Sequence, residues 1–423
     1  VLRVDHPDIL EFVRAKREPG VLRNFNVSVG VTDAFLEAAR EGRDYELRDP
    51  RTGERTGTLN AGQVFEEIVD AAWRTGDPGL LFLDTVNRTQ PTPHLGEIEA
   101  TNPCGEIPLL PYESCNLGSI NLSHMVRERA GRTEVDWEKL GETIRTAFRF
   151  LDDVIEVSRY PVPEIEAMTH GNRKVGLGVM GFADLLIALG ISYDSDEAES
   201  LADRLMRFIA ERALECSQEL AEERGVYPNW PGSVHAAQGL RVRNATRTAI
   251  APTGTISIIA GTSPSIEPLF ALAYRRTHVL EGETLHDVNP LFLEHIRRRG
   301  LDADRIIARV LETGTLRGVP DVDEETRRLF VTALEIPWER HLAIQAAFQR
   351  HVDNSVSKTI NMPEDATRDD VRRSYWRAWE LGLKGITIFR YGSKGAQVLE
   401  VGLRERAVER EHTVKCDPEE CKV

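Results

Sequence analysis

The chain has 423 residues, enough for two or three ordinary domains or for one large α/β barrel. Its formal net charge of −15 argues against a nucleic-acid backbone as the main partner, because such a partner requires a surplus of Lys and Arg. The longest apolar run, 176–191, is too short to cross a membrane and contains Asp184. We therefore expect neither a nucleic-acid partner nor a membrane.

Taken in chain order, the first predicted elements are a short helix over 7–17 and a strand over 26–31, where β-branched residues alternate. Thr32 or Asp33 is suited to cap the next helix. The apolar run 80–83 follows a Gly-Asp-Pro-Gly turn. The segment 87–123 is crowded with Pro, Gly, Asn and Cys, and an irregular loop of this length is usually functional.

Further along, the apolar period predicts one helix from Asp136 to near Pro161 and another over about 196–224. The segments 248–252 and 385–391 are predicted to be short buried strands. Strands that alternate with helices favour parallel pairing, so the sequence predicts an α/β fold.

Five cysteines, at 104, 115, 216, 416 and 421, are irregularly spaced and do not form a disulfide scaffold in a chain of this size. They indicate a reducing, cytoplasmic location with catalytic or redox thiols. Cys216 falls on the apolar face of a predicted helix and is expected in the core. The eleven histidines show no metal-ligand spacing, so no metal site is predicted.

Asn102, Cys104 and Glu106 stand at alternate positions. In an extended segment this spacing places the amide, the thiol and the carboxylate on one side, facing one ligand. Such a set could form a radical, move a proton and hydrogen-bond a hydroxyl. The alternative, for a bare Cys-Gly-Glu tripeptide, is a buried cysteine in a Pro-Gly turn with a solvated glutamate.

The longer string NPCGEIPL, followed by Cys115 in CNLG, resembles the active-site finger of ribonucleotide reductases. The separation of eleven residues between Cys104 and Cys115 resembles the adenosylcobalamin-dependent class. The resemblance implies that Cys104 becomes the thiyl radical that removes the 3′ hydrogen of the ribose. Glu106 would take the proton of the 3′ hydroxyl, and Cys115 would be one half of the reducing dithiol. The substrate-binding residues implied here are Asn102, Pro103, Cys104, Gly105 and Glu106.

The string APTGTIS combines small residues, which let backbone amides approach an anion, with hydroxyl donors. By itself such a string is more often a strand-to-helix turn with capping hydroxyls than a phosphate site, and it lacks the ending of a Walker loop. It resembles the reductase loop that holds the phosphates of the substrate. The residues implied are Pro252, Thr253, Gly254, Thr255, Ile256 and Ser257.

The segment 15–25 corresponds to the family's loop between the effector and substrate sites, where Lys16, Arg17 and Arg23 could contact base or phosphate. An exposed basic turn is nearly as good an interpretation. Cys416 and Cys421 could relay electrons to the active site, form half of a metal-binding knuckle, or be inert.

The strand 385–391 lacks the adjacent tyrosines through which oxygen-dependent reductases import a radical, and no glycyl-radical motif is visible. By elimination and family likeness, adenosylcobalamin is the expected cofactor, although no cobalamin-contacting residue can be named. The implied fold is part of a ten-stranded α/β barrel, built from two antiparallel halves of five parallel strands around a central finger loop. We expect this catalytic barrel over 1–395 and a charged tail over 396–423.

The implied activity is reduction of ribonucleoside di- or triphosphates to deoxyribonucleotides for DNA synthesis. Expected partners are the ribonucleotide, dNTP or ATP effectors and a thioredoxin- or glutaredoxin-like reductant, with the protein a monomer or homodimer. The other reducing cysteine and the main effector pocket are expected upstream of Val1, so this polypeptide alone should be inactive. Two alternatives remain: a reductase subunit fed by a separate radical-generating subunit, or a non-catalytic nucleotide-binding fragment.

Overall fold

The computed structural model describes residues 1–18, 21–22, 25–279 and 283–393. Its strands are β1 (Leu2–Arg3), β2 (Ser28–Val31), β3 (Asp44–Arg48), β4 (Arg55–Asn60), β5 (Gly79–Phe82), β6 (Ala100–Thr101), β7 (Pro108–Leu109), β8 (Asn116–Asn121), β9 (Val126–Arg129), β10 (Arg132–Val135), β11 (Val175–Met180), β12 (Ala273–Val279), β13 (Glu283–Val288), β14 (Thr359–Met362) and β15 (Gly385–Arg390).

The α-helices are α1 (Ile9–Arg14), α2 (Asp33–Glu41), α3 (Ala61–Thr75), α4 (Leu83–Arg88), α5 (Trp137–Val157), α6 (Pro163–Asn172), α7 (Phe182–Leu189), α8 (Asp196–Arg224), α9 (Val234–Ala237), α10 (Gly254–Ala260), α11 (Pro290–Arg298), α12 (Ala303–Thr313), α13 (Glu324–Leu329), α14 (Trp338–Gln349) and α15 (Arg368–Glu380). Two 3₁₀ helices, η1 (Pro93–Leu95) and η2 (Leu122–His124), complete the elements.

The largest sheet has the strand order β1-β2-β5-β15-β14. β1, β2 and β5 are parallel to one another, and β14 is parallel to β15. The direction reverses where β15 pairs antiparallel with β5, Gly385 lying opposite Leu81. The sheet therefore joins two sets of parallel strands that run in opposite directions.

The series of strands continues beyond β14. β8 and β11 pair in parallel. A parallel bridge from Leu177 to Thr248 links β11 to the next segment, and another from Ile250 to Val356 links that segment to the residues just before β14. The strands β8, β11, β14 and β15 thus run parallel, with 248–250 between β11 and β14 joined to its neighbours only by isolated bridges rather than as the regular strand predicted over 248–252. β5, β2 and β1 form the opposing set. This arrangement confirms the α/β fold and the two oppositely directed parallel sets, and the second set has three of the five predicted strands among the described residues.

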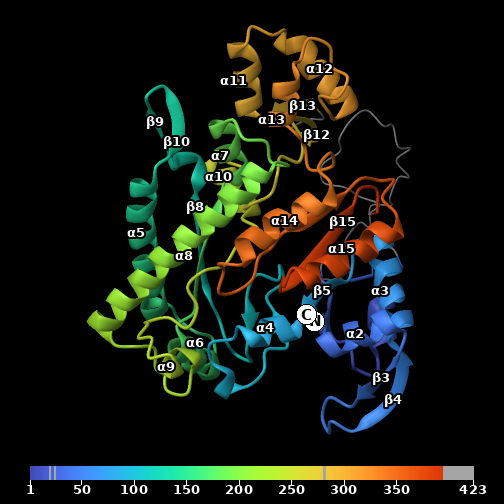
Figure 1. The fold of residues 1–423 in the computed structure, drawn as a ribbon, viewed down its shortest axis with the longest axis vertical. Helices are drawn as coiled ribbons and strands as arrows, with labels where there is room; N and C mark the ends of the chain where they lie inside the picture. The colour runs from blue at the N-terminus through green and yellow to red at the C-terminus, as the bar shows by residue number, and fades with distance from the viewer. Residues whose placement is uncertain (19–20, 23–24, 280–282, 394–423) are drawn as a thin grey trace, which may run out of the picture.

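Of the described helices, α5 and α8 are the two longest; they pack side by side, and α5 lies against β8 and β11 (Figure 1). Asp136 caps α5, because its side chain accepts the backbone N–H of Lys139 at 3.1 Å. α8 ends at Gly225, and Cys216 on its buried face is 7% exposed. Thr32 caps α2 by accepting the N–H of Phe35. These predictions from local sequence signals are confirmed.

A small hydrophobic cluster holds both ends of the finger in place. It joins Ile98 and Leu110, which flank the finger, to Leu81 at β5 and to Leu83 and Val86 in α4. The finger thereby projects from the junction of the two half-barrels. α11, α12 and α13 gather at the top of the view (Figure 1), where their apolar residues join the same hydrophobic core as those of α5 and α8. Among the described residues, no helix combines the length and apolarity needed to cross a bilayer.

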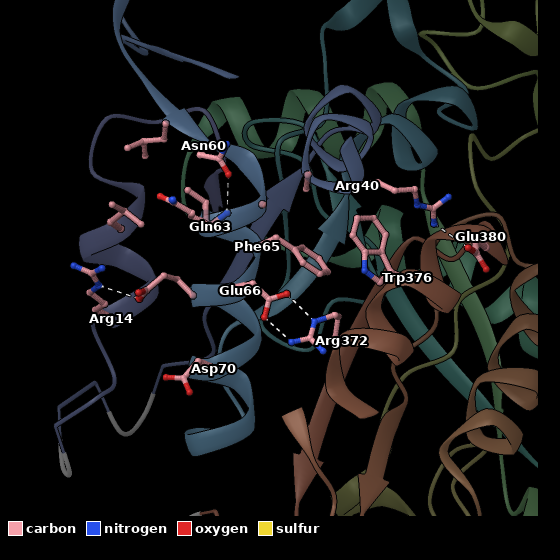
Figure 2. Close-up of a pocket in the computed structure, with 16 residues that line it drawn as sticks. Arg14, Arg40, Asn60, Gln63, Phe65, Glu66, Asp70, Arg372, Trp376 and Glu380 are labelled. Atoms are coloured by element: carbon pink, nitrogen blue, oxygen red, sulfur yellow. Dashed lines mark hydrogen bonds and ion pairs between the residues drawn. The ribbon is translucent and has the colours of Figure 1, made fainter. Parts of the chain in front are cut away.

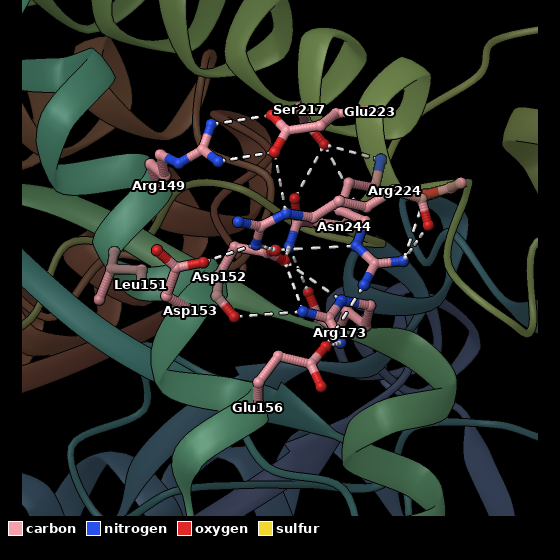
Figure 3. Close-up of polar contacts among 12 residues, drawn as sticks. Arg149, Leu151, Asp152, Asp153, Glu156, Arg173, Ser217, Glu223, Arg224 and Asn244 are labelled. Atoms are coloured by element: carbon pink, nitrogen blue, oxygen red, sulfur yellow. Dashed lines mark hydrogen bonds and ion pairs between the residues drawn. The ribbon is translucent and has the colours of Figure 1, made fainter.

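Asp152 on α5 is the centre of a buried polar network (Figure 3). Its Oδ1 accepts hydrogen bonds from Arg173 and from the amide of Asn244, each at 2.9 Å. Its Oδ2 lies 3.2 Å from a nitrogen of Arg224. The network ties α5 to α8 and to the residues just before β11.

We expect Asp152→Asn to lower the free energy of unfolding by about 3–5 kcal/mol, because it removes the buried carboxylate that Arg173 shares with Arg224 and leaves the buried Arg173 guanidinium only the half-exposed Glu156. Urea denaturation of the full chain measures this loss. The matched control is Asp153→Asn, whose half-exposed side chain pairs with Arg224 and should cost at most about 1 kcal/mol. Equal losses in the two variants would contradict this account of the network.

Candidate active site

The finger is a β-hairpin formed by β6 and β7, with Ala100 opposite Leu109. At its tip the N–H of Gly105 donates to the carbonyl of Asn102 at 3.1 Å, which closes a turn. Pro103 suits the second position of such a turn, and Gly105 has a φ of +83°. The Asn102 side-chain oxygen accepts the N–H of Ile107 at 3.0 Å. The sequence therefore builds a compact tip from Asn, Pro and Gly.

The expectation that Asn102, Cys104 and Glu106 line one side of an extended segment was wrong. The segment is a turn, in which alternate residues do not share a face. Cys104 is exposed, whereas Glu106 is buried. Partial burial is the main cause that raises the pKa of the Cys104 thiol, and the charge of Glu106 adds to the rise. The thiol and the carboxylate are therefore still electrostatically coupled. The turn, rather than a strand, brings the two groups into one neighbourhood.

Glu106 is 2% exposed, and no described residue donates a hydrogen bond to its buried Oε2. Burial raises the pKa of this carboxyl, and hydrogen bonding from its own backbone and from Asn102 partly offsets the rise. A buried carboxylate oxygen without a donor has the free acceptor capacity that a general base requires. Its backbone carbonyl accepts the N–H of Ser355 at 2.8 Å, which docks the finger on the loop before β14.

Cys104 lies on the wall of a cavity of about 440 Å³ between the finger, β2, β5, β14 and β15. Polar groups of Asn26, Ser28 and Asn361 share this wall with apolar strand residues. The Asn26 side chain donates to the carbonyl of Pro103 at 2.9 Å and holds the tip of the finger at the cavity. Glu106 and Cys115 do not line it. The Cys104 thiol is thus accessible from this cavity, whereas the Glu106 carboxylate is not.

Cys115 lies half-buried at the start of β8. Burial raises the pKa of its thiol, Lys174 opposes the rise, and the carboxylates of Glu113 and Glu106 add to it. The charge of Glu106 thus contributes to the raised pKa of both cysteines.

The predicted phosphate loop turns directly into a helix. Thr253 is buried with a left-handed φ of +53°, and its hydroxyl accepts the N–H of Ser265 at 2.7 Å. α10 begins at Gly254, so the backbone N–H groups of Gly254, Thr255 and Ile256 are those of a first helical turn. The Ser257 hydroxyl donates to the Gly254 carbonyl at 3.2 Å. Thr253 and Ser257 therefore shape the loop.

The loop is connected to the finger through backbone hydrogen bonds. The N–H of Ile250 donates to the carbonyl of Ser355, and the N–H of Ser355 donates to the carbonyl of Glu106. Pro252 lines the same cavity as Cys104. Thr253 to Ser257 do not reach that cavity, so the loop is adjacent to the finger without sharing its wall.

The basic residues of 15–25 are engaged within the chain. Lys16 lies 3.1 Å from a carboxylate oxygen of Asp77, and Arg17 lies 2.6 Å from Glu67. Arg23, Cys416 and Cys421 lie outside the described residues. The effector-loop role of Lys16, Arg17 and Arg23 and the electron-relay role of the two cysteines stay predictions.

A larger cavity of about 980 Å³ lies between α1, α3 and α15, away from the finger (Figure 2). Its charged groups already pair with one another: Arg372 binds Glu66 through two hydrogen bonds of 2.7 Å, and Arg14 binds Glu67 at 3.2 Å. No cysteine lines it. The smaller cavity is therefore the candidate active site, because it has an exposed thiol on its wall.

Sequence reasoning missed three buried lysines around the site: Lys174, Lys358 and Lys384. Lys358 lines the Cys104 cavity and pairs with Glu267. Lys384 donates to the carbonyls of Asp353 and Asn354, and burial lowers its pKa to about 8. A lysine in a sequence looks like a surface residue, so the pattern carried no signal for their burial.

The family model described as "Ribonucleotide reductase, barrel domain" matches residues 1–389. This chain belongs to the ribonucleotide reductase family. In the solved alpha subunit of an Actinobacillus ureae class Id ribonucleotide reductase, the likeness extends over 92% of this chain and 70% of that one, with 26% identity and a TM-score of 0.73.

Two relatives are named vitamin B12-dependent ribonucleoside-diphosphate reductase. The protein of Thermoplasma acidophilum is 52% identical over 406 residues, covering 96% of this reductase chain and 52% of that protein. The protein of Mycobacterium tuberculosis (strain CDC 1551 / Oshkosh) is 54% identical over 400 residues, covering 94% and 57%. The chain thus spans about half the length of the curated relatives it matches.

Proposed function

We propose that this chain supplies the catalytic barrel of an adenosylcobalamin-dependent ribonucleotide reductase that acts on ribonucleoside diphosphates. The observation that carries the proposal is the finger. Its compact turn holds an exposed thiol, and two residues on lies a buried carboxylate with one oxygen that has no hydrogen-bond donor among the described residues. The names of the two relatives support the diphosphate as substrate.

In this proposal Cys104, as a thiyl radical, takes the 3′ hydrogen of the ribose and later returns a hydrogen to the same carbon. Glu106 accepts the proton of the 3′ hydroxyl as general base, through the oxygen that has no donor among the described residues. The 2′ hydroxyl leaves as water. Cys115 and a second cysteine supply two electrons and end as a disulfide, which an external dithiol reduces.

Binding of the vitamin B12 coenzyme requires a cavity whose size and polarity suit part of the coenzyme. The cavity of about 440 Å³ has the size of a small-molecule site, and its lining mixes apolar strand residues with polar side chains, among them Asn26, Asn361 and the charged Asp77 and Lys358. These residues fit the nucleoside end of adenosylcobalamin, and Cys104 is on the same wall. When bound, the coenzyme supplies an organic radical by homolysis of its cobalt–carbon bond. We assign no residue of this chain to the corrin ring.

The substrate is placed against Glu106, Cys115 and the loop from Pro252 to Ser257. The first-turn N–H groups of α10 and the Thr255 hydroxyl would hold its phosphates. dNTP or ATP effectors and a thioredoxin- or glutaredoxin-like dithiol are the further proposed partners. The described cysteines, 104, 115 and 216, are free thiols, which supports a reducing, cytoplasmic location.

The alternative, a separate radical-generating subunit, is favoured only by the likeness to the class Id alpha subunit at 26% identity. One assay separates the two. The full-length protein, given adenosylcobalamin, a ribonucleoside diphosphate and a dithiol under exclusion of oxygen, is expected to form deoxyribonucleotide without any second subunit. Absence of product under these conditions would reject the cobalamin proposal.

We expect Thr255→Ala in the full-length protein to raise KM for the diphosphate by about tenfold with a smaller change in kcat. The variant loses one hydrogen bond to the substrate phosphates, and this bond is expected in the ground state and in the transition state alike. Steady-state kinetics measure this. The control is Thr313→Ala on α12, whose exposed hydroxyl donates to Arg309 within its own helix. An unchanged KM for Thr255→Ala would argue against phosphate binding at this residue.

A further inference from the structure

Glu113 and Lys174 form an ion pair that is closed to solvent at the base of the finger hairpin. Their side chains are 0% and 1% exposed, and Lys174 Nζ lies 2.6 Å from Glu113 Oε2. The desolvation of two buried charges offsets most of their attraction, so such a pair adds little net stability. Stability alone therefore does not account for its place in the fold.

The pair joins the finger to the residues that lead into β11. Glu113 Oε2 also accepts the backbone N–H of Leu110 at 2.9 Å, and its Oε1 accepts the amide of Asn172 at 2.5 Å. Lys174 Nζ lies 3.4 Å from the carbonyl oxygen of Pro108 in β7. These contacts fix the Lys174 ammonium at one point relative to the hairpin.

The pairing of β8 with β11 places Lys174 beside Cys115. Val175 is the register partner of Asn116 in this parallel pair, so the preceding residues, Lys174 and Cys115, are neighbours on adjacent segments. A Cβ at Gly176 would lie 3.5 Å from Cys115 Sγ. Because positions 174 and 176 share one face, the sulfur lies on the face that carries the lysine.

The residue before Lys174 is held equally firmly, as Figure 3 shows. Arg173 ends α6 with a left-handed φ of 49°, and its guanidinium bonds Asp152 at 2.9 Å. Its carbonyl accepts the amide of Asn244 at 3.0 Å. The backbone at 173–174 is therefore anchored on both sides.

We infer that Lys174 is a positioning residue that holds a positive charge beside the Cys115 thiol, with Glu113 setting the place of that charge. The inference rests on the proposed function, in which Cys115 is one of the reducing thiols. A nearby positive charge matters for such a thiol because the thiolate is the reactive form in thiol–disulfide exchange. The charged groups that act on Cys115 are Lys174, Glu113 and Glu106. Without the lysine, only burial and two carboxylates would act on the sulfur, and all of these oppose the thiolate.

The test is the alkylation of Cys115 by iodoacetamide in the reduced, full-length protein at pH 8.5, followed by peptide mass spectrometry. Lys174→Met is expected to slow the reaction by about tenfold, which corresponds to a rise of one unit in the pKa of the thiol. Glu113→Gln is expected to accelerate it, because a carboxylate that disfavours the thiolate is gone. Lys174→Arg keeps the charge and should stay near the wild-type rate.

A purely structural role predicts a different pattern, because loosening the hairpin exposes Cys115 and both neutral variants then react faster. Acceleration in Lys174→Met, or unchanged rates in both variants, would overturn the inference. Should Lys174→Met fail to fold, a slowed Glu113→Gln or a strongly altered Lys174→Arg would overturn it as well. Lys358→Met, which breaks the other buried lysine–glutamate pair, is the control and should leave Cys115 alkylation unchanged. Alkylation needs no turnover, so these rates are read independently of whether the protein reduces ribonucleotides.

Discussion

Cys104→Ser in the full-length protein is expected to lower deoxyribonucleotide formation by at least about 1,000-fold, as the loss of an essential reacting group does in other enzymes. A serine hydroxyl is nearly isosteric with the thiol, so the turn formed by Asn102 and Gly105 should persist. An alcohol O–H bond is stronger than a ribose C–H bond, so a carbon-centred radical cannot readily take the hydrogen of the serine hydroxyl and form the serine oxygen radical. Product formation with the coenzyme and an external dithiol, measured by chromatography, checks the prediction.

The control for that experiment is Cys216→Ala, which removes a thiol from the buried face of α8. It should lower stability modestly, by about 1 kcal/mol, and leave the rate of product formation close to that of the wild type. Comparable rates of product formation for Cys104→Ser and the wild type would show that this thiol takes no part in the reaction. Absence of product from both would leave the nucleotide-binding alternative.

Glu106→Gln is expected to lower kcat by about 10²- to 10⁴-fold, the range that a positioned general base contributes. The amide keeps the size of the side chain but cannot accept a proton. Steady-state kinetics of the full-length protein measure the loss. Glu99→Gln, just before the hairpin, is a suitable control, because that carboxylate is 60% exposed and lies 3.5 Å from Arg3 at the surface. A kcat for Glu106→Gln within a few-fold of the wild type would contradict the assignment.

The same assignment predicts the direction of the pH dependence. Burial raises the pKa of Glu106, so its protonated, inactive form persists to higher pH than for an ordinary carboxyl. The wild-type rate should therefore fall as the pH drops through this raised pKa. Glu106→Gln should lose that acidic limb, whereas Glu99→Gln should keep it.

Much of the fold could be predicted from local signals. Asp136 and Gly225 mark helix ends through contacts within a few residues, and the β-branched alternation before Thr32 marks β2. The finger and the phosphate loop were recognisable because their chemistry is carried by contiguous residues.

Contacts between distant residues were not predictable in this way. The turn at Asn102 was mistaken for an extended segment, because alternate spacing is the same in a strand and in a turn. Whether Lys174 is buried depends on Glu113, 61 positions away, and a charged residue just before a glycine-rich strand gives no indication of that partner. The Asp152 network likewise joins α5, α8 and the segment before β11, which only the folded chain brings together.

A crystal structure of the full-length protein with a bound ribonucleoside diphosphate tests the central claim most directly. We expect the ribose 3′ carbon within about 4 Å of Cys104 Sγ, the 3′ hydroxyl hydrogen-bonded to the free oxygen of Glu106, and the phosphates at the first turn of α10. A nucleotide bound with its ribose away from Cys104, or with its phosphates remote from Thr255, would contradict the account.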